Sequence, residues 1–293
     1  MKLLILGCNG QLGRCLSDQL VNTDYQVVYT SRTEIDISDF QATKEKICEI
    51  SPHVVINATA YTAVDQAEEN HEIADIVNHL AVLNIAEVCT KLGSWLVHVS
   101  TDYVFDGEST EPYKESSETA PQGVYGVTKL KGEIAIQASG CLHLIIRTAW
   151  VFSEYGNNFL KTMLRLGAQR DELNVVGDQV GCPTYAQDIA KVIVEALACI
   201  KLKKCASGIY HYCGDVPCSW YDFANSIFYE AKTLGFRIPK TVNSIDTDSY
   251  PTLASRPSFS VLDSSKIKIA FGVEASNWND GVTESLKRIR KFT

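Results

Sequence analysis

Tyr125 and Lys129 are the two residues of this sequence whose types and spacing most directly suggest chemistry. They are four positions apart, so in a helix over residues 123–138 both side chains would lie on one face. An ammonium group beside a phenol favours the phenolate and lowers the tyrosine pKa, which makes the phenol a better proton donor near working pH. Such a pair also occurs by chance in helices, so its meaning depends on the segments that precede it.

Thr101 ends an apolar run that begins at Trp95, and this run predicts a strand. In open α/β sheets, ligands bind at the carboxyl ends of the strands. The Thr101 hydroxyl could therefore reach the same reacting oxygen as Tyr125. For the next residue, Asp102, the simplest role is structural, because its short carboxylate could hydrogen-bond the backbone of the turn that follows.

A glycine-rich turn near the start of the sequence predicts a dinucleotide site. Residues 7–13 read Gly-Cys-Asn-Gly-Gln-Leu-Gly, after an apolar strand at residues 2–6 and before a helical pattern. Glycines there let the backbone turn sharply and approach a pyrophosphate at the helix N-terminus. Cys8 within the turn is either a thiol of lowered pKa or a small packing side chain.

The second predicted strand ends at Ser31 and Arg32, where folds of this kind contact the adenosine ribose. NAD-selective folds usually place an acid there, and this sequence has none between Val27 and Thr33. Arg32 could instead hold a 2′-phosphate with two hydrogen bonds. We therefore expect NADPH as the cofactor, with NADH also accepted; the alternative is that Arg32 points to solvent.

Strands and helices alternate up to residue 147, which predicts an α/β fold with a Rossmann-type, doubly wound parallel sheet. The small residues that begin at Ala58, after the third strand, would let the backbone lie against a cofactor. The pattern loosens afterwards. We expect an NAD(P)-binding domain at residues 1–148 with 183–212 returning to it, and a smaller C-terminal substrate-binding lobe at 149–182 and 213–293.

Composition excludes several classes of function. The 27 Lys+Arg against 35 Asp+Glu give a net charge of -8, without a long basic run, which argues against a nucleic-acid partner. No uninterrupted apolar stretch reaches the ~18 residues of a membrane span, and residues 2–6 are too short for a signal-peptide core. Ten cysteines without a Cys-x-x-Cys pair, and six scattered histidines, predict a cytoplasmic protein with free thiols and no metal site.

Six further segments, in one order, resemble the dTDP-4-dehydrorhamnose reductase family of the extended short-chain dehydrogenases/reductases. They are residues 57–65, 100–105, 147–151, 157–159, 178–184 and 250–257. The resemblance implies reduction of the C4 keto group of a dTDP-sugar by a nicotinamide cofactor. It implies that Tyr125 donates the proton, that Lys129 holds the nicotinamide ribose and that Thr101 hydrogen-bonds the alkoxide.

The resemblance also implies that Asp102 and Trp150 contact the sugar nucleotide, although Trp150 could instead belong to a core. With the strand-end positions described above, the expected cofactor site comprises Gly7, Gly10, Gln11, Leu12, Gly13, Ser31, Arg32, Asp36, Ile37, Ala58, Ala60, Tyr61, Thr62, Tyr125 and Lys129.

The sequence departs from the family at two positions. Some members bind magnesium at a dimer contact through glutamates, and two matching positions hold Cys15 and Gln187 here. Neutral side chains are poor ligands for a hard cation. We therefore expect no metal, and a monomer or weak homodimer.

Two other functions fit parts of the pattern. Related sugar-nucleotide dehydratases place Asp-Glu after the threonine, whereas Asp102-Tyr103 follows Thr101 here, which disfavours dehydration strongly and epimerisation less so. A non-catalytic regulatory subunit, like the methionine adenosyltransferase β-subunit, also resembles this family. The intact set of Thr101, Tyr125 and Lys129 favours a reductase that turns over.

Overall fold

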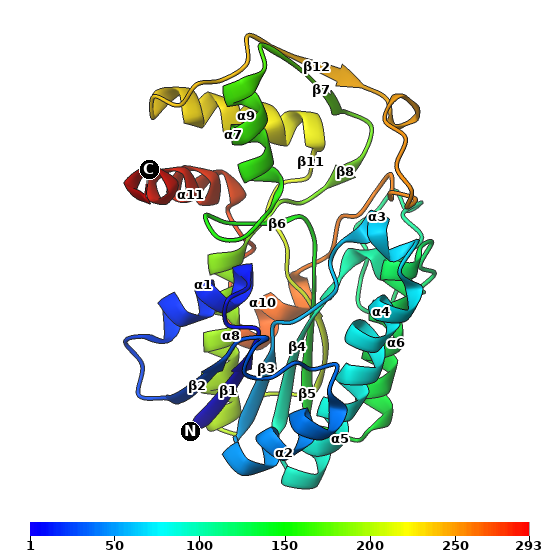
Figure 1. The fold of residues 1–293 in the computed structure, drawn as a ribbon, viewed down its shortest axis with the longest axis vertical. Coiled ribbons are helices and arrows are strands. Elements are labelled where there is room, and N and C mark those ends of the chain that lie inside the picture. Colours follow the sequence, from blue (N-terminus) through cyan, green and yellow to red (C-terminus); the bar gives the residue numbers. More distant parts are fainter. Residues whose placement is uncertain (293) are drawn as a thin grey trace.

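The computed structural model describes residues 1–292 and has two lobes (Figure 1). The larger lobe is built on a six-stranded parallel sheet, whose strands are rich in Val, Ile and Leu because helices cover both faces. Its strands are β1 (Lys2–Leu6), β2 (Gln26–Thr30), β3 (Val54–Asn57), β4 (Trp95–Thr101), β5 (His143–Thr148) and β10 (Gly208–His211). The predicted Rossmann-type α/β fold is confirmed.

The strand order is β2-β1-β3-β4-β5-β10, with every neighbouring pair parallel. The order reverses between β1 and β3, so the loops after these two strands diverge and leave a crevice at the carboxyl edge. In doubly wound sheets ligands bind at such a point. The glycine turn follows β1 and the segment after Asn57 follows β3, so the topology places both beside this crevice.

Two hydrophobic layers enclose the sheet. One lies under α1 (Gln11–Leu20), α8 (Ala186–Lys201) and α10 (Ser265–Phe271). The other lies under α2 (Phe40–Ile50), α5 (Ala81–Leu92) and α6 (Val124–Ala138). Neighbouring residues of β1 divide between the layers: Leu3 and Ile5 face the first, whereas Leu4 and Leu6 face the second. This alternation is what a strand buried on both faces requires.

An apolar stripe of Ala74, Val77, Ala81, Ile85 and Val88 predicts a helix at about 70–92, and the structure forms it from three segments. They are α4 (His71–Asp75), the π-helical turn η1 (Ile76–Leu80) and α5. Together, residues 71–92 are long and apolar enough to cross a membrane by length and composition alone. However, α5 packs its apolar side against the sheet within the second layer, so a core helix accounts for this composition. The helix ends at Leu92, and Gly93 after it adopts the left-handed conformation common at helix C-termini.

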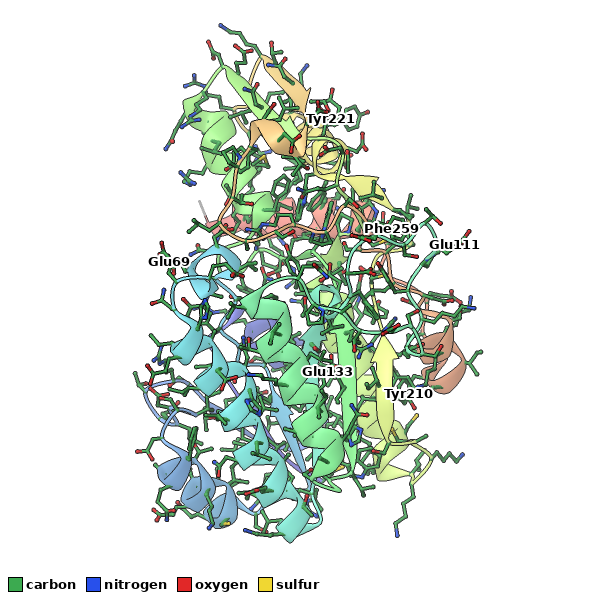
Figure 2. All side chains as sticks on the ribbon, turned by 90° about the vertical axis from the view of Figure 1, so that its right-hand side faces the viewer. Glu69, Glu111, Glu133, Tyr210, Tyr221 and Phe259 are labelled. Atoms are coloured by element: carbon green, nitrogen blue, oxygen red, sulfur yellow. The ribbon has the colours of Figure 1, made fainter. Side chains whose placement is uncertain are left out.

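The smaller lobe has its own aromatic core above the carboxyl edge of the sheet (Figure 1). Its elements are α7 (Phe159–Gln169), β7 (Glu172–Val176), β8 (Val180–Gly181), β11 (Cys218–Ser219), α9 (Trp220–Thr233), β12 (Thr241–Ile245), η3 (Thr247–Ser249) and α11 (Trp278–Phe292). The parallel pair β6 (Val151–Phe152) and β9 (Thr184–Tyr185) leads into and out of it. Figure 2 shows Tyr221 within this lobe, Phe259 at the level where the lobes meet, and Glu133 below on α6.

Two elements differ from the sequence-based expectation. Three prolines at 239, 251 and 257 predict a loop over residues 239–262, but β12 within it pairs with β7 over five residues. The helix α10 was not expected, and it packs against β10 and α8 beside the sheet although it falls within residues 213–293. Its sequence, Ser-Lys-Ile-Lys-Ile-Ala-Phe, alternates like a strand, which concealed the helix.

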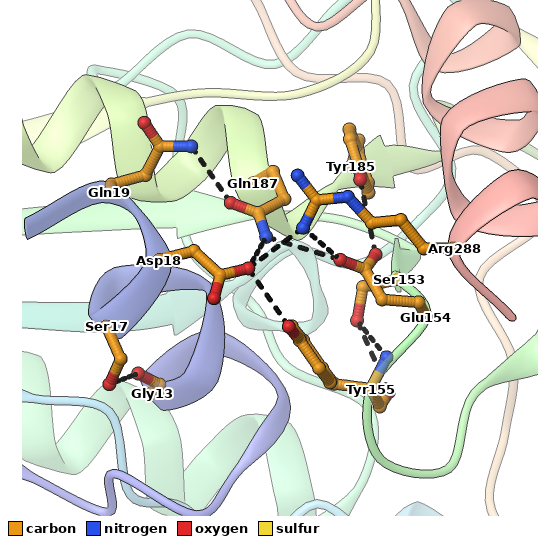
Figure 3. Close-up of polar contacts among 10 residues, drawn as sticks. All are labelled: Gly13, Ser17, Asp18, Gln19, Ser153, Glu154, Tyr155, Tyr185, Gln187 and Arg288. Atoms are coloured by element: carbon orange, nitrogen blue, oxygen red, sulfur yellow. Dashed lines mark hydrogen bonds and ion pairs between the residues drawn. The ribbon is translucent and has the colours of Figure 1, made fainter. Parts of the chain in front are cut away.

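A charged cluster joins α11 of the smaller lobe to α1 of the larger one (Figure 3). Glu154, in the loop after β6, has a side chain only 1% exposed, and its Oε1 accepts from Nη1 of Arg288 at 2.8 Å. The same guanidinium donates to Asp18 of α1 at 2.9 Å. Gln187 of α8 donates to Asp18 at 2.6 Å and to Glu154 at 3.3 Å. One cation and one amide thus compensate two carboxylates at the junction.

This cluster predicts a large difference between neighbouring substitutions on α11. Arg288→Gln leaves Glu154 buried without a cation and should lower the free energy of unfolding by about 3 kcal/mol, the low end of the range because Arg288 is 38% exposed. Lys287→Gln, the control, removes an exposed pair with Glu284 and should cost less than about 1 kcal/mol. Urea unfolding measures both. Equal losses would show that Glu154 does not depend on Arg288.

Candidate active site

The loop between β1 and α1 brings the first-turn N–H groups of α1 to the carboxyl edge of the sheet, while the N–H groups of Gly7, Cys8 and Gly10 donate to backbone carbonyls of the protein. Gly7 has a φ of +82°, and Gly10 takes the N-cap position of α1 without a side-chain cap. A Cβ atom on Gly13 would lie 2.3 Å from the carbonyl oxygen of Gly7, so only glycine permits this approach. First-turn amides of a helix lack helical partners and, with the helix dipole, suit a phosphate group. The loop therefore fits the pyrophosphate of a dinucleotide.

The side chains of Gln11 and Leu12, which lie within this glycine-rich turn, contact other parts of the protein. Gln11 donates through Nε2 to the carbonyl oxygen of Val151 at 3.3 Å, and its Oε1 accepts from Nδ2 of Asn158 at 2.6 Å. Leu12 packs into the core between α1 and the sheet. Both residues therefore offer a cofactor their backbone N–H groups, and the side chain of Gln11 ties the turn to the loops that lead into the smaller lobe.

The end of β2 holds an acid that the sequence pattern did not single out. Glu34 folds back so that its Oε2 accepts from the backbone N and from the Oγ of Ser31, both at 2.7 Å. The side chain of Arg32 is 85% exposed and pairs with Asp36 at 3.3 Å. Because the ribose is recognised at this strand end, Glu34 and Arg32 place opposite charges near it.

Asp36 and Ile37 lie just beyond this strand end. Asp36 accepts from the backbone N and the Oγ of Ser38, and these hydrogen bonds hold the pKa of its carboxyl below the ordinary value. Ile37 is buried and packs beside Ile35 in the second hydrophobic layer. A cofactor could thus meet the carboxylate of Asp36 or the local backbone, but not the side chain of Ile37.

Cys8 does not have the lowered pKa that its position suggested. Partial burial, and next the charge of Glu34, raise the pKa of the thiol. Its Sγ lies 3.7 Å from Oδ1 of Asn9, and the side chain packs against the core around α1. The alternative of a small packing side chain therefore agrees with the structure.

The segment after β3 is held in place by Asn78, a buried residue of the π-helical turn η1. Asn78 Oδ1 accepts from the backbone N of Tyr61 at 2.9 Å, and its Nδ2 donates to the carbonyl oxygen of Tyr61 at 3.1 Å. These bonds fix the path of residues 60–62, while Ala58 lies against Gly7 of the glycine turn. Turns of this π type are frequent at functional sites.

The structure brings Thr101, Tyr125 and Lys129 together at the carboxyl end of β4. Thr101 is the last residue of the strand, and Tyr125, in the first turn of α6, lies close enough for the Thr101 side chain to influence the pKa of its phenol. Lys129 follows one helical turn later and is only 1% exposed. Its Nζ donates to the carbonyl oxygen of Val99 at 2.8 Å. A hydroxyl, a phenol and an amine thus share one strand end.

Burial dominates the protonation of this group. It raises the pKa of Tyr125 above the ordinary value, while the hydrogen bond with Thr101 acts in the opposite direction. Burial also lowers the pKa of Lys129 to about 8, and the charge of Glu133 raises it. The expected lowering of the Tyr125 pKa is therefore wrong for this structure, because desolvation disfavours the charged form of both groups. A phenol that keeps its proton at neutral pH can still give it to a reacting oxygen.

Asp102 does more than brace the turn after β4. Its Oδ1 accepts from Oγ1 of Thr101 at 2.9 Å, whereas its Oδ2 has no hydrogen-bond partner among the described residues. Burial raises the pKa of this carboxyl to about 6. Buried polar atoms are normally hydrogen-bonded, and the hydroxyl of Ser260, which is likewise buried without a partner among the described residues, lies near this carboxyl.

Trp150 occupies the turn between β5 and β6 in a strained conformation. Its φ of +46° lies in the left-handed region, which bulky residues rarely adopt. One face of the indole stacks on Trp220 with 3.5 Å between ring centroids, and a Cβ on Gly181 would lie 2.5 Å from the ring. Strain of this kind is concentrated at functional sites, so Trp150 combines packing on the core of the smaller lobe with a backbone conformation typical of such sites.

Three residues at the edge of the site had no assigned role. Arg256 donates through Nη1 to the hydroxyl of Tyr103 at 2.9 Å and through Nη2 to Asp65 at 2.6 Å. The ring of Tyr103 meets that of Tyr125 edge to face, with 5.5 Å between centroids. All three residues lie in segments that resemble the reductase family. Arg256 is 153 positions from Tyr103 and 191 from Asp65, so their contacts cannot be identified from sequence spacing.

The raised pKa of Asp102 predicts a pH dependence of stability. The unfolded chain ionises this carboxyl near its ordinary value of 3.8, and the folded protein only near 6, so stability is lost as pH rises between these values. The loss is about 3 kcal/mol at about 1.4 kcal/mol per pKa unit. Asp102→Asn should lack it and should be more stable than the wild type at neutral pH.

Urea unfolding across this pH range measures the effect. Asp106→Asn is the control of opposite sign, because a hydrogen bond from Tyr113 lowers the pKa of Asp106. A stability difference between the wild type and Asp102→Asn that stays constant across this range would contradict the assignment, because other carboxyls contribute equally to both proteins.

Comparison with known proteins agrees with this geometry. The family model described as RmlD substrate binding domain matches residues 1–291. The chain is 46% identical to a dTDP-4-dehydrorhamnose reductase of Aggregatibacter actinomycetemcomitans, over 99% of each chain. The solved structure of such a reductase from Clostridium acetobutylicum has a TM-score of 0.91 at 40% identity, covering 99% of this chain and 100% of that one.

A second solved structure bears on the cofactor. The dTDP-4-dehydrorhamnose reductase of Bacillus anthracis, in complex with NADP, has a TM-score of 0.89 at 34% identity and covers 100% of this chain and 99% of that one. The match thus extends over both lobes and includes the glycine turn, the end of β4 and α6. This chain belongs to the dTDP-4-dehydrorhamnose reductase family.

Proposed function

We propose that the protein reduces the C4 keto group of dTDP-4-dehydro-L-rhamnose to give dTDP-L-rhamnose, with NADPH as the cofactor. The observation that carries this proposal is the convergence of Thr101, Tyr125 and Lys129 at the end of β4, one strand away from the crevice beside the glycine turn. The names of the relatives support the substrate class.

The residues divide the work in the following way. When bound, the nicotinamide cofactor supplies a hydride, and the amides of the glycine turn hold its pyrophosphate. Tyr125 keeps its proton until charge develops on the C4 oxygen and then donates it. The hydroxyl of Thr101 stabilises the same oxygen. Asp102 and Trp150 contact the sugar nucleotide from β4 and from the entrance of the smaller lobe, and Lys129 holds the nicotinamide ribose.

The division into domains remains part of the proposal, with residues 1–148 and 183–212 binding the cofactor and residues 149–182 and 213–293 the substrate. Ten free cysteines suit a reducing compartment, and the cytoplasm is the location we propose.

We further propose a monomer or weak homodimer that needs no divalent metal. Cys15 is fully buried, and Gln187 turns its amide nitrogen towards Asp18 and Glu154. Arg288 already supplies those carboxylates with a positive charge. Among the described residues, no group of three His, Cys, Asp or Glu side chains could hold a metal ion.

One assay separates the reductase from its alternatives. The pure protein is incubated with NADPH and dTDP-4-dehydro-L-rhamnose, cofactor oxidation is followed by absorbance, and the sugar product is identified by NMR. A reductase oxidises the cofactor and forms the 4-hydroxy sugar. An epimerase changes the sugar without net oxidation of the cofactor, and a regulatory subunit does neither. Tyr103 occupies the position where dehydratases hold a glutamate, which disfavours dehydration.

Tyr125→Phe removes the proton donor and leaves the ring, with its contact to Tyr103, in place. We expect kcat to fall by about 10²–10⁴-fold, the usual contribution of general acid catalysis, with nearly unchanged affinity for NADPH. Steady-state kinetics and fluorescence titration measure the two quantities. Near-normal turnover in the variant would refute the role of Tyr125.

Arg32 predicts the cofactor preference. A charge-assisted contact with the 2′-phosphate is worth roughly 1.5–3 kcal/mol, so we expect NADPH to exceed NADH by about ten- to hundred-fold in kcat/KM. Arg32→Ala should erase most of this preference by weakening NADPH alone. Glu34→Gln should increase it, because the variant keeps an acceptor for Ser31 but removes a negative charge.

Lys46→Ala, which removes a cation paired with Glu49 on α2, is the control for general charge effects. An unchanged NADPH preference in Arg32→Ala would place the phosphate contact elsewhere.

A further inference from the structure

Behind Lys129, a row of buried polar side chains crosses the sheet from β3 to α6. Asn57, His98 and Lys129 are each at most 1% exposed. Asn57 Nδ2 lies 3.2 Å from Nδ1 of His98, and Nε2 of His98 lies 3.1 Å from Nζ of Lys129. The row begins at Thr59, whose backbone N and Oγ1 lie 3.1 and 2.5 Å from Oδ1 of Asn57. No step of the mechanism described above uses Asn57 or His98.

The backbone of Thr59 fixes the direction of the first hydrogen bonds. A peptide N–H can only donate, so the side-chain atom of Asn57 that faces it must be the carbonyl oxygen. The amide nitrogen of Asn57 must then face His98 and donate to Nδ1. A neutral imidazole has one acceptor and one donor, so His98 carries its proton on Nε2 and directs it at Lys129.

This tautomer restricts the charge of Lys129. An ammonium group has three donors and no acceptor, so a protonated Lys129 would meet the N–H of His98 donor to donor. A neutral amine accepts from Nε2 of His98 and donates to the carbonyl oxygen of Val99, which satisfies both contacts. Protonating His98 instead would place an imidazolium beside Lys129, and burial together with Lys129 lowers the pKa of His98 well below its ordinary value.

We propose that Asn57 and His98 are positioning residues that hold Lys129 as a neutral amine in the free protein. Lys129 is then a hydrogen-bond acceptor that gains its charge only when the row is rearranged. The neutral charge of Lys129 and the tautomer of His98 are inferred from the hydrogen-bond geometry. Their use in catalysis rests on the proposed reductase function.

The surroundings of Lys129 support the neutral form. The carboxylate of Glu133, one turn further along α6, favours the ammonium, but Arg147 of β5 holds it at 2.6 Å and partly neutralises it. Tyr125, one turn earlier, keeps its proton and carries no compensating charge. Burial lowers the pKa of Lys129 to about 8, which by itself leaves the amine mostly charged at pH 7 and neutral above about pH 8. The contact with the N–H of His98 at 3.1 Å favours the neutral amine further, because an ammonium group cannot accept a hydrogen bond.

Asn57→Asp tests the direction of the row. A carboxylate still accepts from Thr59 and presents its second oxygen to His98, so the imidazole proton should move to Nδ1. Nε2 then becomes an acceptor for a Lys129 ammonium group. An opposite charge introduced near a lysine raises its pKa by about one unit or more, so we expect at least a tenfold gain in the proton affinity of Lys129.

Nuclear magnetic resonance with ¹⁵N-labelled histidine and lysine reads both changes on the free protein, without activity. We expect the Nε2–H form of His98 and a neutral Lys129 near pH 8.5 in the wild type, and the Nδ1–H form with a charged Lys129 in Asn57→Asp. Thr59→Ala is the matched control, because it keeps the backbone N–H that orients Asn57 and should leave the tautomer unchanged. A wild-type His98 protonated on Nδ1 would overturn the proposal, even if the variant fails to fold.

The kinetic measurement separates this proposal from the proposed function. If catalysis uses the charged Lys129, the alkaline limb of kcat should move to higher pH in Asn57→Asp. An Nε2–H tautomer in a protein without reductase activity would refute the function and support the row. Reductase activity together with an Nδ1–H tautomer in the wild type would support the function and refute the proposed roles of Asn57 and His98.

Discussion

The close packing of α6 on the end of β4 is the constraint on which the site depends. A Cβ on Gly126 would lie 2.2 Å from the carbonyl oxygen of Tyr103, and a Cβ on Gly132 would lie 2.3 Å from that of Asn78. Glycine at both positions lets the helix approach the backbone of its neighbours. Glu133 then pairs with Arg147 of β5 at 2.6 Å, with both side chains at most 3% exposed, which fixes the rotation of the helix. Since Tyr125 and Lys129 lie on this helix, their positions follow from these contacts.

The same packing excludes water, and the loss of water sets the protonation of the site. Burial keeps the proton on Tyr125, raises the pKa of Asp102 to about 6 and lowers that of Lys129 to about 8. At neutral pH Asp102 and Lys129 work against stability, because both would be charged and well solvated in the unfolded chain, whereas Tyr125 is neutral in both states. The strained φ of Trp150 adds to this cost. The two hydrophobic layers of the sheet and the aromatic core of the smaller lobe must offset it.

The sequence predicted those features that depend on short-range pattern. The strand-turn-helix spacing at residues 2–20 and the alternation up to residue 147 led to the fold, and the four-residue spacing of Tyr125 and Lys129 led to the shared helix face. It did not predict Glu34 at the end of β2, because its contact with Ser31 requires a reversal of the chain after the strand. Nor could it identify His98 as the partner of Lys129. A histidine in an apolar strand is most simply a core residue, and only the three-dimensional pairing of β4 with α6 reveals its contact.

The two junctions between the lobes show why long-range contacts escaped the pattern and how they differ physically. At the active site, Arg256 joins Asp65 and Tyr103, and the side chain of Asp65 is 41% exposed. On the side of α1, Arg288 joins Asp18 to Glu154, whose side chain is 1% exposed. Water can solvate Asp65 when the first junction opens, so that separation is inexpensive. Arg288 and Glu154 both belong to the smaller lobe, so opening the second junction breaks the pair of Arg288 with Asp18, whose side chains are 38% and 35% exposed. It also removes the hydrogen bond that Gln187 of α8 donates to the buried Glu154. The second junction thus adds a buried hydrogen bond to a partly solvated ion pair, which makes it the more costly of the two to open.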